Sequence, residues 1–61
     1  MRGCRIIERR HVSDERAVVL ARAGDIWLVY REHCGNLYML TKCFSWRSAR
    51  ETFADYIRTA A

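Results

Sequence analysis

At 61 residues the chain is long enough for one small domain, which buries only about 60% of the surface that its unfolded form exposes. Its 11 Lys and Arg against 7 Asp and Glu give a formal net charge of +4, which is low for a dedicated nucleic-acid binder. The three cysteines form no CxxC pair and no even-numbered framework, so they argue against a disulfide-built secreted mini-protein and predict reduced thiols.

Four segments of the chain have the composition of β-strands. The second and third are rich in β-branched and aromatic residues, and Gly24 and Gly35 supply turns between consecutive strands. Gly24 is expected to take the left-handed conformation of a type I turn with a bulge. The short connections predict antiparallel pairing, because parallel strands need long crossovers. The expected strands cover residues 4–11, 16–22, 26–32 and 37–44.

The C-terminal segment has the periodicity of an amphipathic helix, expected over residues 46–59. Its apolar residues recur at spacings of three and four, while Arg47 and Glu51 fall on the opposite side. Ser45 is a candidate N-cap, and Ser48 with Glu51 offers a competing capping box one turn later. The apolar stripe consists of Trp46, Ala49, Phe53, Tyr56, Ile57 and Ala60.

The third expected strand is apolar on both of its faces. Ile26, Leu28 and Tyr30 point to one side, whereas Trp27 and Val29 point to the other. One helix covers only one face of a small sheet, so an apolar surface remains for a protein partner or for a homodimer. The sequence predicts a single α+β domain: a three- to four-stranded antiparallel β-meander followed by one C-terminal amphipathic α-helix packed on one sheet face.

No residue cluster in the sequence is diagnostic of catalysis, a cofactor or a metal. His11, His33 and the three cysteines are possible ligands, but they lack the two close pairs that mark most zinc sites. His33 and Cys34 are adjacent, and on an extended backbone their side chains point to opposite faces. The GxSxG, P-loop and GxGxxG motifs are absent. We expect no enzymatic activity, no catalytic residue, no cofactor and no metal.

Basic residues concentrate in the N-terminal part of the chain and make nucleic-acid binding a second hypothesis. Aromatic residues on a sheet can stack on bases beside such residues. The alternative interpretation is a solvated basic edge strand with its aromatic residues in the core, and Glu8, Asp14 and Glu15 dilute the positive charge. The candidate contacts to a partner or a nucleic acid are Arg5, Arg9, Arg10, His11, Arg16, Arg22, Trp27, Tyr30, Arg31 and Lys42.

Three expected strands lead into the signature Phe44-Ser45-x-x-x-Ala49-x-x-x-Phe53, with Trp27 in the middle strand. This pattern resembles the arm-binding domains of phage integrases and the related AP2-type domains. In that family a three-stranded sheet enters the DNA major groove and the helix backs it, so the resemblance implies this fold and DNA binding over about residues 16–59. The chain departs from the family because its central strand carries only Arg31 and its last strand only Lys42, where the family's DNA-facing strands are richly basic.

We expect no signal peptide, and no run of the sequence approaches the ~20 apolar residues of a membrane span. We expect it in the cytoplasm, or in a host cell's cytoplasm for a phage product, without membrane contact. Small proteins with scattered charge and no catalytic set are common among phage and plasmid accessory proteins. We therefore expect a non-catalytic interaction module that inhibits a host nucleic-acid-processing complex, of the anti-CRISPR or anti-restriction type. The alternative is a small basic DNA-binding protein that uses the sheet and the N-terminal arginines.

Overall fold

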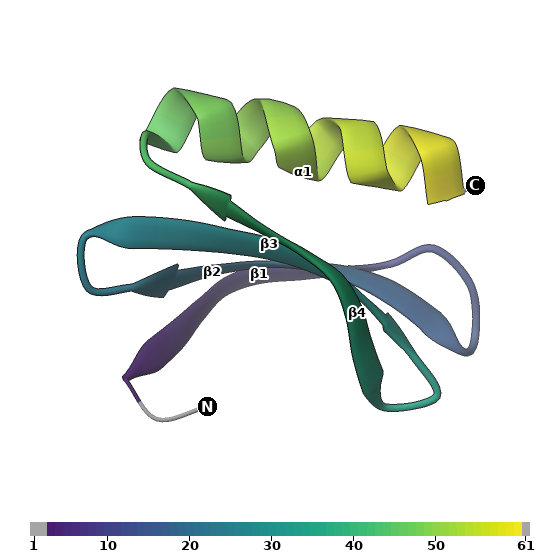
Figure 1. Cartoon of the computed structure of the whole chain (residues 1–61). Helices are drawn as coiled ribbons and strands as arrows, with labels where there is room; N and C mark the ends of the chain where they lie inside the picture. Colours follow the sequence, from purple (N-terminus) through teal and green to yellow (C-terminus); the bar gives the residue numbers. More distant parts are fainter. Residues whose placement is uncertain (1–2, 61) are drawn as a thin grey trace.

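The computed structural model describes residues 3–60, which form one antiparallel sheet and one helix. The elements are β1 Cys4–His11, β2 Arg16–Ala23, β3 Ile26–His33, β4 Asn36–Cys43 and α1 Trp46–Ala60. The strands follow one another in the sheet in the order β1-β2-β3-β4, and α1 lies across one face (Figure 1). This confirms the α+β fold that the sequence predicts.

The β2–β3 turn is tighter than the sequence suggested. Ala23 pairs directly with Ile26, which leaves a two-residue loop, and Gly24 has a φ of 62°. Asp25 is not among the described residues with positive φ, so the loop matches a type II′ turn, with glycine at its first central position. The expected type I turn with a bulge was therefore wrong. The two-residue turn is favoured because its twist matches that of the flanking strands.

The β3–β4 turn places two successive residues in the left-handed region. Cys34 has a φ of 53° and Gly35 a φ of 83°, and His33 pairs with Asn36. Positive φ at both central positions defines a type I′ turn. Because this loop is so short, β4 begins at Asn36, one residue before the expected strand.

Ser45 begins the helix. Its Oγ accepts a hydrogen bond from the backbone N–H of Ser48 at 3.1 Å, and its carbonyl accepts one from Ala49 at 3.0 Å. The hydroxyl satisfies one of the backbone donors that a helix start leaves unpaired. Of the two expected caps, the structure therefore uses Ser45.

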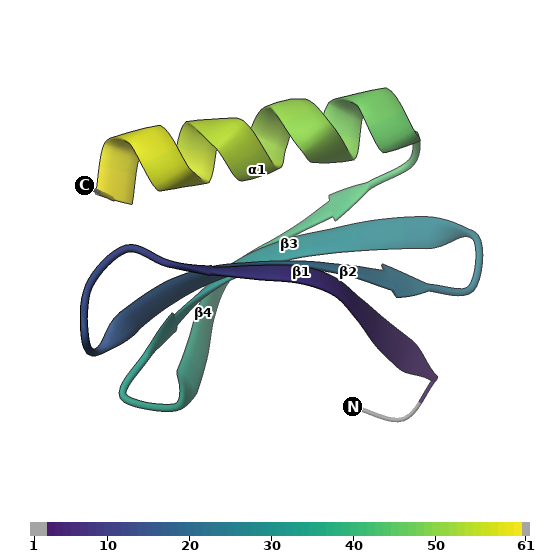
Figure 2. The same ribbon diagram turned by 180° about the vertical axis from the view of Figure 1, so that it is seen from behind.

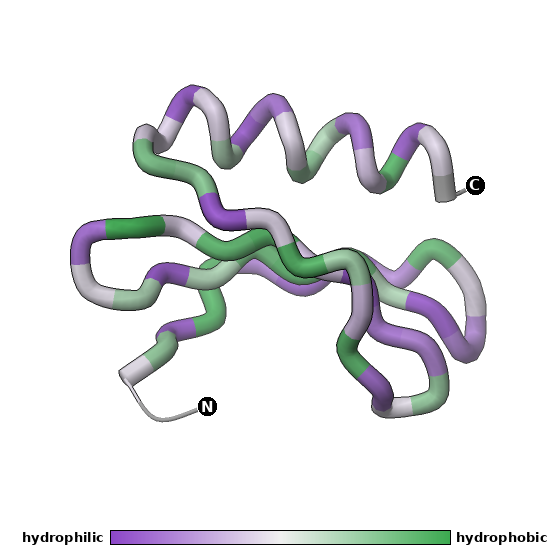
Figure 3. Tube along the Cα trace, viewed as in Figure 1, coloured by the Kyte–Doolittle hydropathy of each residue, from purple (hydrophilic) through white to green (hydrophobic). Residues whose placement is uncertain are grey.

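The face of the sheet beneath α1 holds the larger apolar core. Ala49 and Phe53 of the helix are buried against the sheet, and Tyr56, Ile57 and Trp27 pack around them. Trp46, expected in the same stripe, remains 44% exposed, and the Ala60 side chain lies outside the described part of the structure. Hydrophobic parts of α1 face the sheet and hydrophilic parts face away (Figure 3). The sheet side of this core consists of Val18, Leu20, Val29 and Cys43.

The opposite face of the sheet has a second, smaller core that no helix covers. Its four residues are buried even so, and Tyr30 is only 7% exposed. The beginning of β1 and the β3–β4 hairpin bend away from α1, which makes this face concave (Figures 1 and 2). The bend lets neighbouring side chains close over the centre of the sheet. The four residues are Val19, Ala21, Leu28 and Tyr30.

Two bulges produce the bending. The pairing of β1 with β2 shifts register between Ile6 and Glu8, which leaves Ile7 as an extra residue. The pairing of β3 with β4 shifts between Val29 and Arg31, and Met39 in β4 has a φ of 54° there. A bulge bends its strand, increases the local twist and reverses the alternation of faces beyond it.

Candidate functional site

The bulge in β1 divides the N-terminal arginines between the two faces of the sheet. Arg5 pairs with Arg22 and Arg10 with Val18, which places Arg5 and Arg10 on the side of α1. Arg9 pairs with Val19 of the second core and therefore lies on the opposite side. His11 pairs with Ala17 and shares the side of Arg9. The structure does not bring the basic residues of β1 together into one patch.

Two of these arginines are engaged in ion pairs. Arg9 Nε lies 3.1 Å from a carboxylate oxygen of Glu32 in β3, and Arg10 Nη2 lies 2.7 Å from one of Glu8. Both pairs are partly exposed, so their contribution to stability is small. Their effect on binding is to neutralise two of the positive charges that the sequence offered to a phosphate backbone.

Arg31 lies between the sheet and the helix. Its Nη2 donates to the Thr59 hydroxyl at 2.7 Å, and its guanidinium stacks 5.2 Å from the centre of the Tyr56 ring. The Tyr56 hydroxyl in turn donates to the carbonyl of Met39 at 3.1 Å and forms a second hydrogen bond with Thr41. Arg31 therefore holds the C-terminal half of α1 on the sheet.

Tyr30 is enclosed in the second core, where it offers no stacking surface to a ligand. Burial raises the pKa of its phenol, and the charge of Glu32 raises it further. Its place in the structure is that of a core residue, and so the sheet presents no Tyr30 ring to solvent.

The remaining aromatic candidate, Trp27, belongs to a row at the start of α1 in which two neighbouring tryptophan rings have an arginine at each end. The Arg22 guanidinium lies 5.1 Å from the Trp27 ring, and Trp27 lies 6.3 Å from Trp46 at an interplanar angle of 54°. Arg50 continues the row 5.6 Å from the Trp46 ring. Sequence reasoning missed Arg50, although its i,i+4 spacing from Trp46 is a signal for such a contact. The row fixes the first turn of the helix on β2 and β3.

The sheet face turned away from α1, which we call the open face, carries exposed apolar side chains around its buried centre. Ile6 of β1 is 49% exposed, and Leu37 and Leu40 of β4 are 46% and 44% exposed. Leu37 pairs with Glu32, and Leu40 lies two residues before Lys42, the partner of Leu28. The rim therefore continues the apolar centre outward to both edges of the sheet. Sequence reasoning anticipated an uncovered apolar face but not which one, because β3 is apolar on both sides.

Charged residues border the open face. Arg9, His11 and Lys42 lie on it together with Glu32, which is paired to Arg9. The side chain of Lys42 makes no ion pair or hydrogen bond with any residue between 3 and 60. The border is therefore positive, with Lys42 as its uncompensated charge. Arg16 is the last of the expected contacts. It is exposed, pairs with His33 of β3, and lies on the sheet face that α1 covers.

A shallow groove runs between β1 and α1. It has a volume of about 230 Å³, and Phe53 and Ile57 line it together with the charged residues Glu8, Arg10 and Arg50. Ligand pockets commonly enclose ~300–1,000 Å³, so the groove is small for a metabolite. Glu8 and Arg10, which line the groove, form an ion pair with each other and so neutralise two of the groove's charges.

The chain matches no family model, no curated protein and no solved structure. In the part of the chain that the structure describes, no helix is long and apolar enough to cross a membrane. The functional inference therefore rests on the surfaces described above, among them the open face with its half-exposed apolar rim.

Proposed function

We propose that this protein is a non-catalytic interaction module that binds a partner protein through its open face. The observation that carries the proposal is the row of half-exposed apolar side chains, Ile6, Leu37 and Leu40, around a centre that no helix covers. Apolar surface that stays exposed in a small domain is a typical feature of protein-binding sites. A partner with a convex apolar surface would fit this concave face (Figures 1 and 2).

The charges on the open face favour a partner whose apolar patch is bordered by carboxylates. Arg9 and Glu32 neutralise each other, so Lys42 leaves the face with a net positive charge. Complementary charge steers association and fixes register. A second copy of the chain would bring two positive open faces and two net charges of +4 together, so we favour an acidic partner over a homodimer.

We further propose that the chain is a small phage or mobile-element accessory protein that inhibits a host nucleic-acid-processing complex. Its size, its scattered charge and its uncovered apolar face support this assignment. The positive net charge argues against inhibition by DNA mimicry, which requires a surface of carboxylates in place of phosphates. The inhibitor would instead dock by its apolar face on an acidic region of the complex.

DNA binding through the same face is the competing function. The integrase-like arrangement places the sheet face opposite the helix in the major groove, and here that face presents Lys42, His11 and an already paired Arg9. Its leucines and isoleucine offer phosphates no hydrogen bonds. The composition of the face therefore favours a protein partner over a phosphate backbone.

The test compares two aspartate variants that each remove one exposed apolar side chain. Leu40→Asp places a charge on the open face, whereas Tyr38→Asp alters a 37% exposed residue of β4 that pairs with Arg31 and therefore lies on the side of α1. The tagged chain is used to isolate a stoichiometric partner from host lysate, and the purified partner is then titrated calorimetrically. We expect Leu40→Asp to weaken binding by at least ~10-fold, because it replaces an apolar contact with a charge, and Tyr38→Asp to leave it unchanged.

Three results would contradict the proposal. The first is equal loss of affinity in both variants, and the second is a homodimer in sedimentation equilibrium that Leu40→Asp dissociates. The third is binding of duplex DNA whose affinity falls steeply with salt, is insensitive to Leu40→Asp and is weakened by Arg9→Ala. That last result would establish the competing function, because steep salt dependence reports the release of counterions from DNA.

A further inference from the structure

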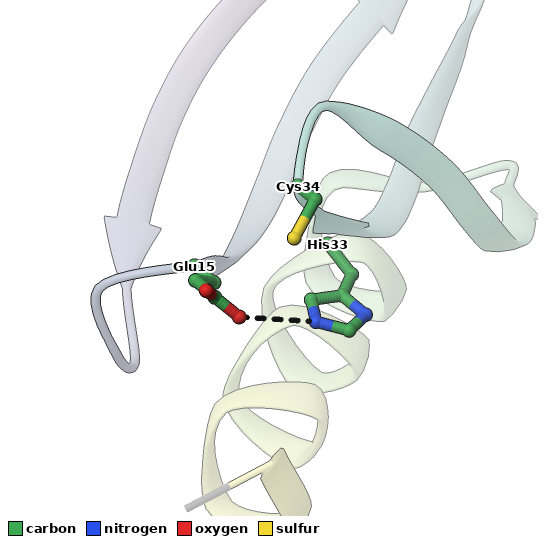
Figure 4. A group of neighbouring side chains, drawn as sticks. All are labelled: Glu15, His33 and Cys34. Carbon is green, nitrogen blue, oxygen red and sulfur yellow. Dashed lines mark ion pairs between the residues drawn. The ribbon is translucent and has the colours of Figure 1, made fainter.

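Glu15, His33 and Cys34 converge at the end of the sheet where the β1–β2 and β3–β4 turns lie (Figure 4). Their carboxylate oxygen, imidazole nitrogen and sulfur atoms all lie within 4.8 Å of one another. His33 Nε2 lies 3.6 Å from a carboxylate oxygen of Glu15. Figure 4 shows the thiol of Cys34 on the same side of the turn as the imidazole and the carboxylate.

The backbone of the type I′ turn creates this convergence. Adjacent residues on an extended strand would point apart, which is why sequence reasoning did not pair His33 with Cys34. The φ of 53° at Cys34 ends the alternation and swings its side chain back toward His33. The backbone N–H of Cys34 also donates to the carbonyl of Glu15 at 2.9 Å, which joins the two turns. Residues that are 19 positions apart are thereby held together by the main chain.

We propose that Glu15, His33 and Cys34 bind one zinc ion. Sulfur, nitrogen and oxygen in one site suit a borderline-soft divalent metal, whereas calcium and magnesium prefer oxygen ligands alone. Metal–ligand distances of ~2.0–2.3 Å in a tetrahedron place ligand atoms ~3.3–3.8 Å apart, and the 3.6 Å between Glu15 and His33 falls in that range. Three protein ligands leave a fourth position for water or for a ligand from outside.

Charge and access also suit a divalent cation. The carboxylate and a thiolate together carry two negative charges, which neutralise the metal even beside Arg16, the strand partner of His33. The side chains of His33 and Glu15 are 45% and 69% exposed, so a metal ion reaches them without a change of fold. Within the described residues the thiol and the imidazole make no hydrogen bond with each other, which favours metal binding over a nucleophilic thiol.

The bound metal would cross-link the two turns at one end of the sheet. A domain of this size has a small core, and a metal or disulfide staple commonly supplies the stability that such a core lacks. The site lies at the sheet's end and is independent of Leu37, Leu40 and Ile6 on the open face. Its failure would leave the proposed protein interaction untouched.

The test is a cobalt titration of the reduced, metal-free protein, followed by displacement with zinc. Cobalt bound by a thiolate gives a near-ultraviolet charge-transfer band, and tetrahedral geometry gives strong visible bands. We expect one cobalt per chain and a higher melting temperature with zinc. Cys34→Ser and His33→Ala should each lower the affinity by at least ~10-fold, since loss of even an outer-shell partner has that effect. Glu15→Gln should lower it as well.

Cys4→Ser and His11→Ala are the matched controls, because Cys4 lies at the other end of the sheet and His11 lies on the sheet face opposite His33. They should bind cobalt as the natural chain does. Cobalt binding without the sulfur band, binding that survives Cys34→Ser, or equal losses in the controls would overturn the proposal. Circular dichroism of each variant checks that a loss of binding is not a loss of fold.

Discussion

At the level of single residues, Cys34 combines an unfavourable backbone conformation with an exposed thiol that could bind a metal. A type I′ turn takes Asn-Gly or Asp-Gly by preference, since asparagine and aspartate tolerate positive φ better than other residues. Cysteine at φ 53° is therefore a local exception to the rules of turn formation. Such exceptions are expected at functional positions, and the proposed metal site accounts for this one.

We predict that Cys34→Asn stabilises the metal-free protein by about 0.5–1 kcal/mol, because asparagine relieves the cost of the left-handed conformation. Urea unfolding of the reduced chain without metal measures this difference. Cys34→Val is the control and should destabilise, since a β-branched residue fits positive φ poorly. A lower stability for Cys34→Asn than for the natural chain would contradict the turn assignment. The same variant should bind cobalt at least ~10-fold more weakly, as is expected of Cys34→Ser.

Tyr30 makes stability depend on pH at the alkaline end. Burial raises the pKa of its phenol, so the folded state favours the neutral form. The stabilisation is complete below the unfolded-state pKa of ~10 and is lost as the pH rises from there through the higher pKa of the folded state. We predict a smaller loss of unfolding free energy in Tyr30→Phe than in the natural chain between about pH 8 and pH 10.5. Parallel plots of unfolding free energy against pH for the two proteins, measured by urea unfolding, would contradict this prediction. They would show that Tyr30 ionises as readily in the folded state as in the unfolded state.

At the level of elements, the β-bulges decide which residues share a face. Without the extra residue in β1, Arg5, Arg9 and His11 would alternate onto one side, as the sequence suggests. The register shift after Ile6 sends Arg5 to the side of α1 and the other two to the open face. Nothing in residues 4–11 marks that shift, because no glycine lies there. A basic strand in the sequence therefore became two separate positive regions.

The helix start offers a direct test of the cap. Ser45→Ala should lower stability by about 1 kcal/mol, because the Ser48 N–H loses its acceptor. Ser48→Ala is the matched control and should be neutral or slightly stabilising, since alanine suits a helix interior. Thermal or urea unfolding of both variants gives the comparison. If Ser48→Ala were the more damaging change, the helix would begin one turn later with the alternative capping box.

Phe53 links α1 to the larger core, where it is 6% exposed beside Val18, Leu20 and Val29. We predict that Phe53→Ala costs about 3–5 kcal/mol, which is comparable to the whole stability of a domain this small. The variant should lack the cooperative unfolding transition and the near-ultraviolet dichroism of the natural chain. Trp46→Ala, at a 44% exposed position of the same helix, should remain folded. A cooperatively folded Phe53→Ala would mean that the helix stripe is not the core.

At the level of the whole molecule, periodic signals were predictable and long-range juxtapositions were not. The helix stripe around Phe53 and the two turns at Gly24 and Gly35 are local patterns, so the sequence reveals them. The face that α1 covers depends on where the chain leaves β4, and β3 is apolar on both sides. The meeting of Glu15 with His33 depends on sheet register and on one positive φ, neither of which composition encodes. The helix covers one face of the sheet, and the open face is left available for a partner.

The most direct test of the central claim is site-specific photo-crosslinking in the cells where the protein acts. A photoreactive phenylalanine analogue replaces Leu40 on the open face in one variant and Tyr38, on the side of α1, in another. We predict a single discrete protein adduct from position 40 that is absent or much weaker from position 38. Equal adducts from both positions, adducts from position 38 alone, or crosslinks to nucleic acid only would contradict the account.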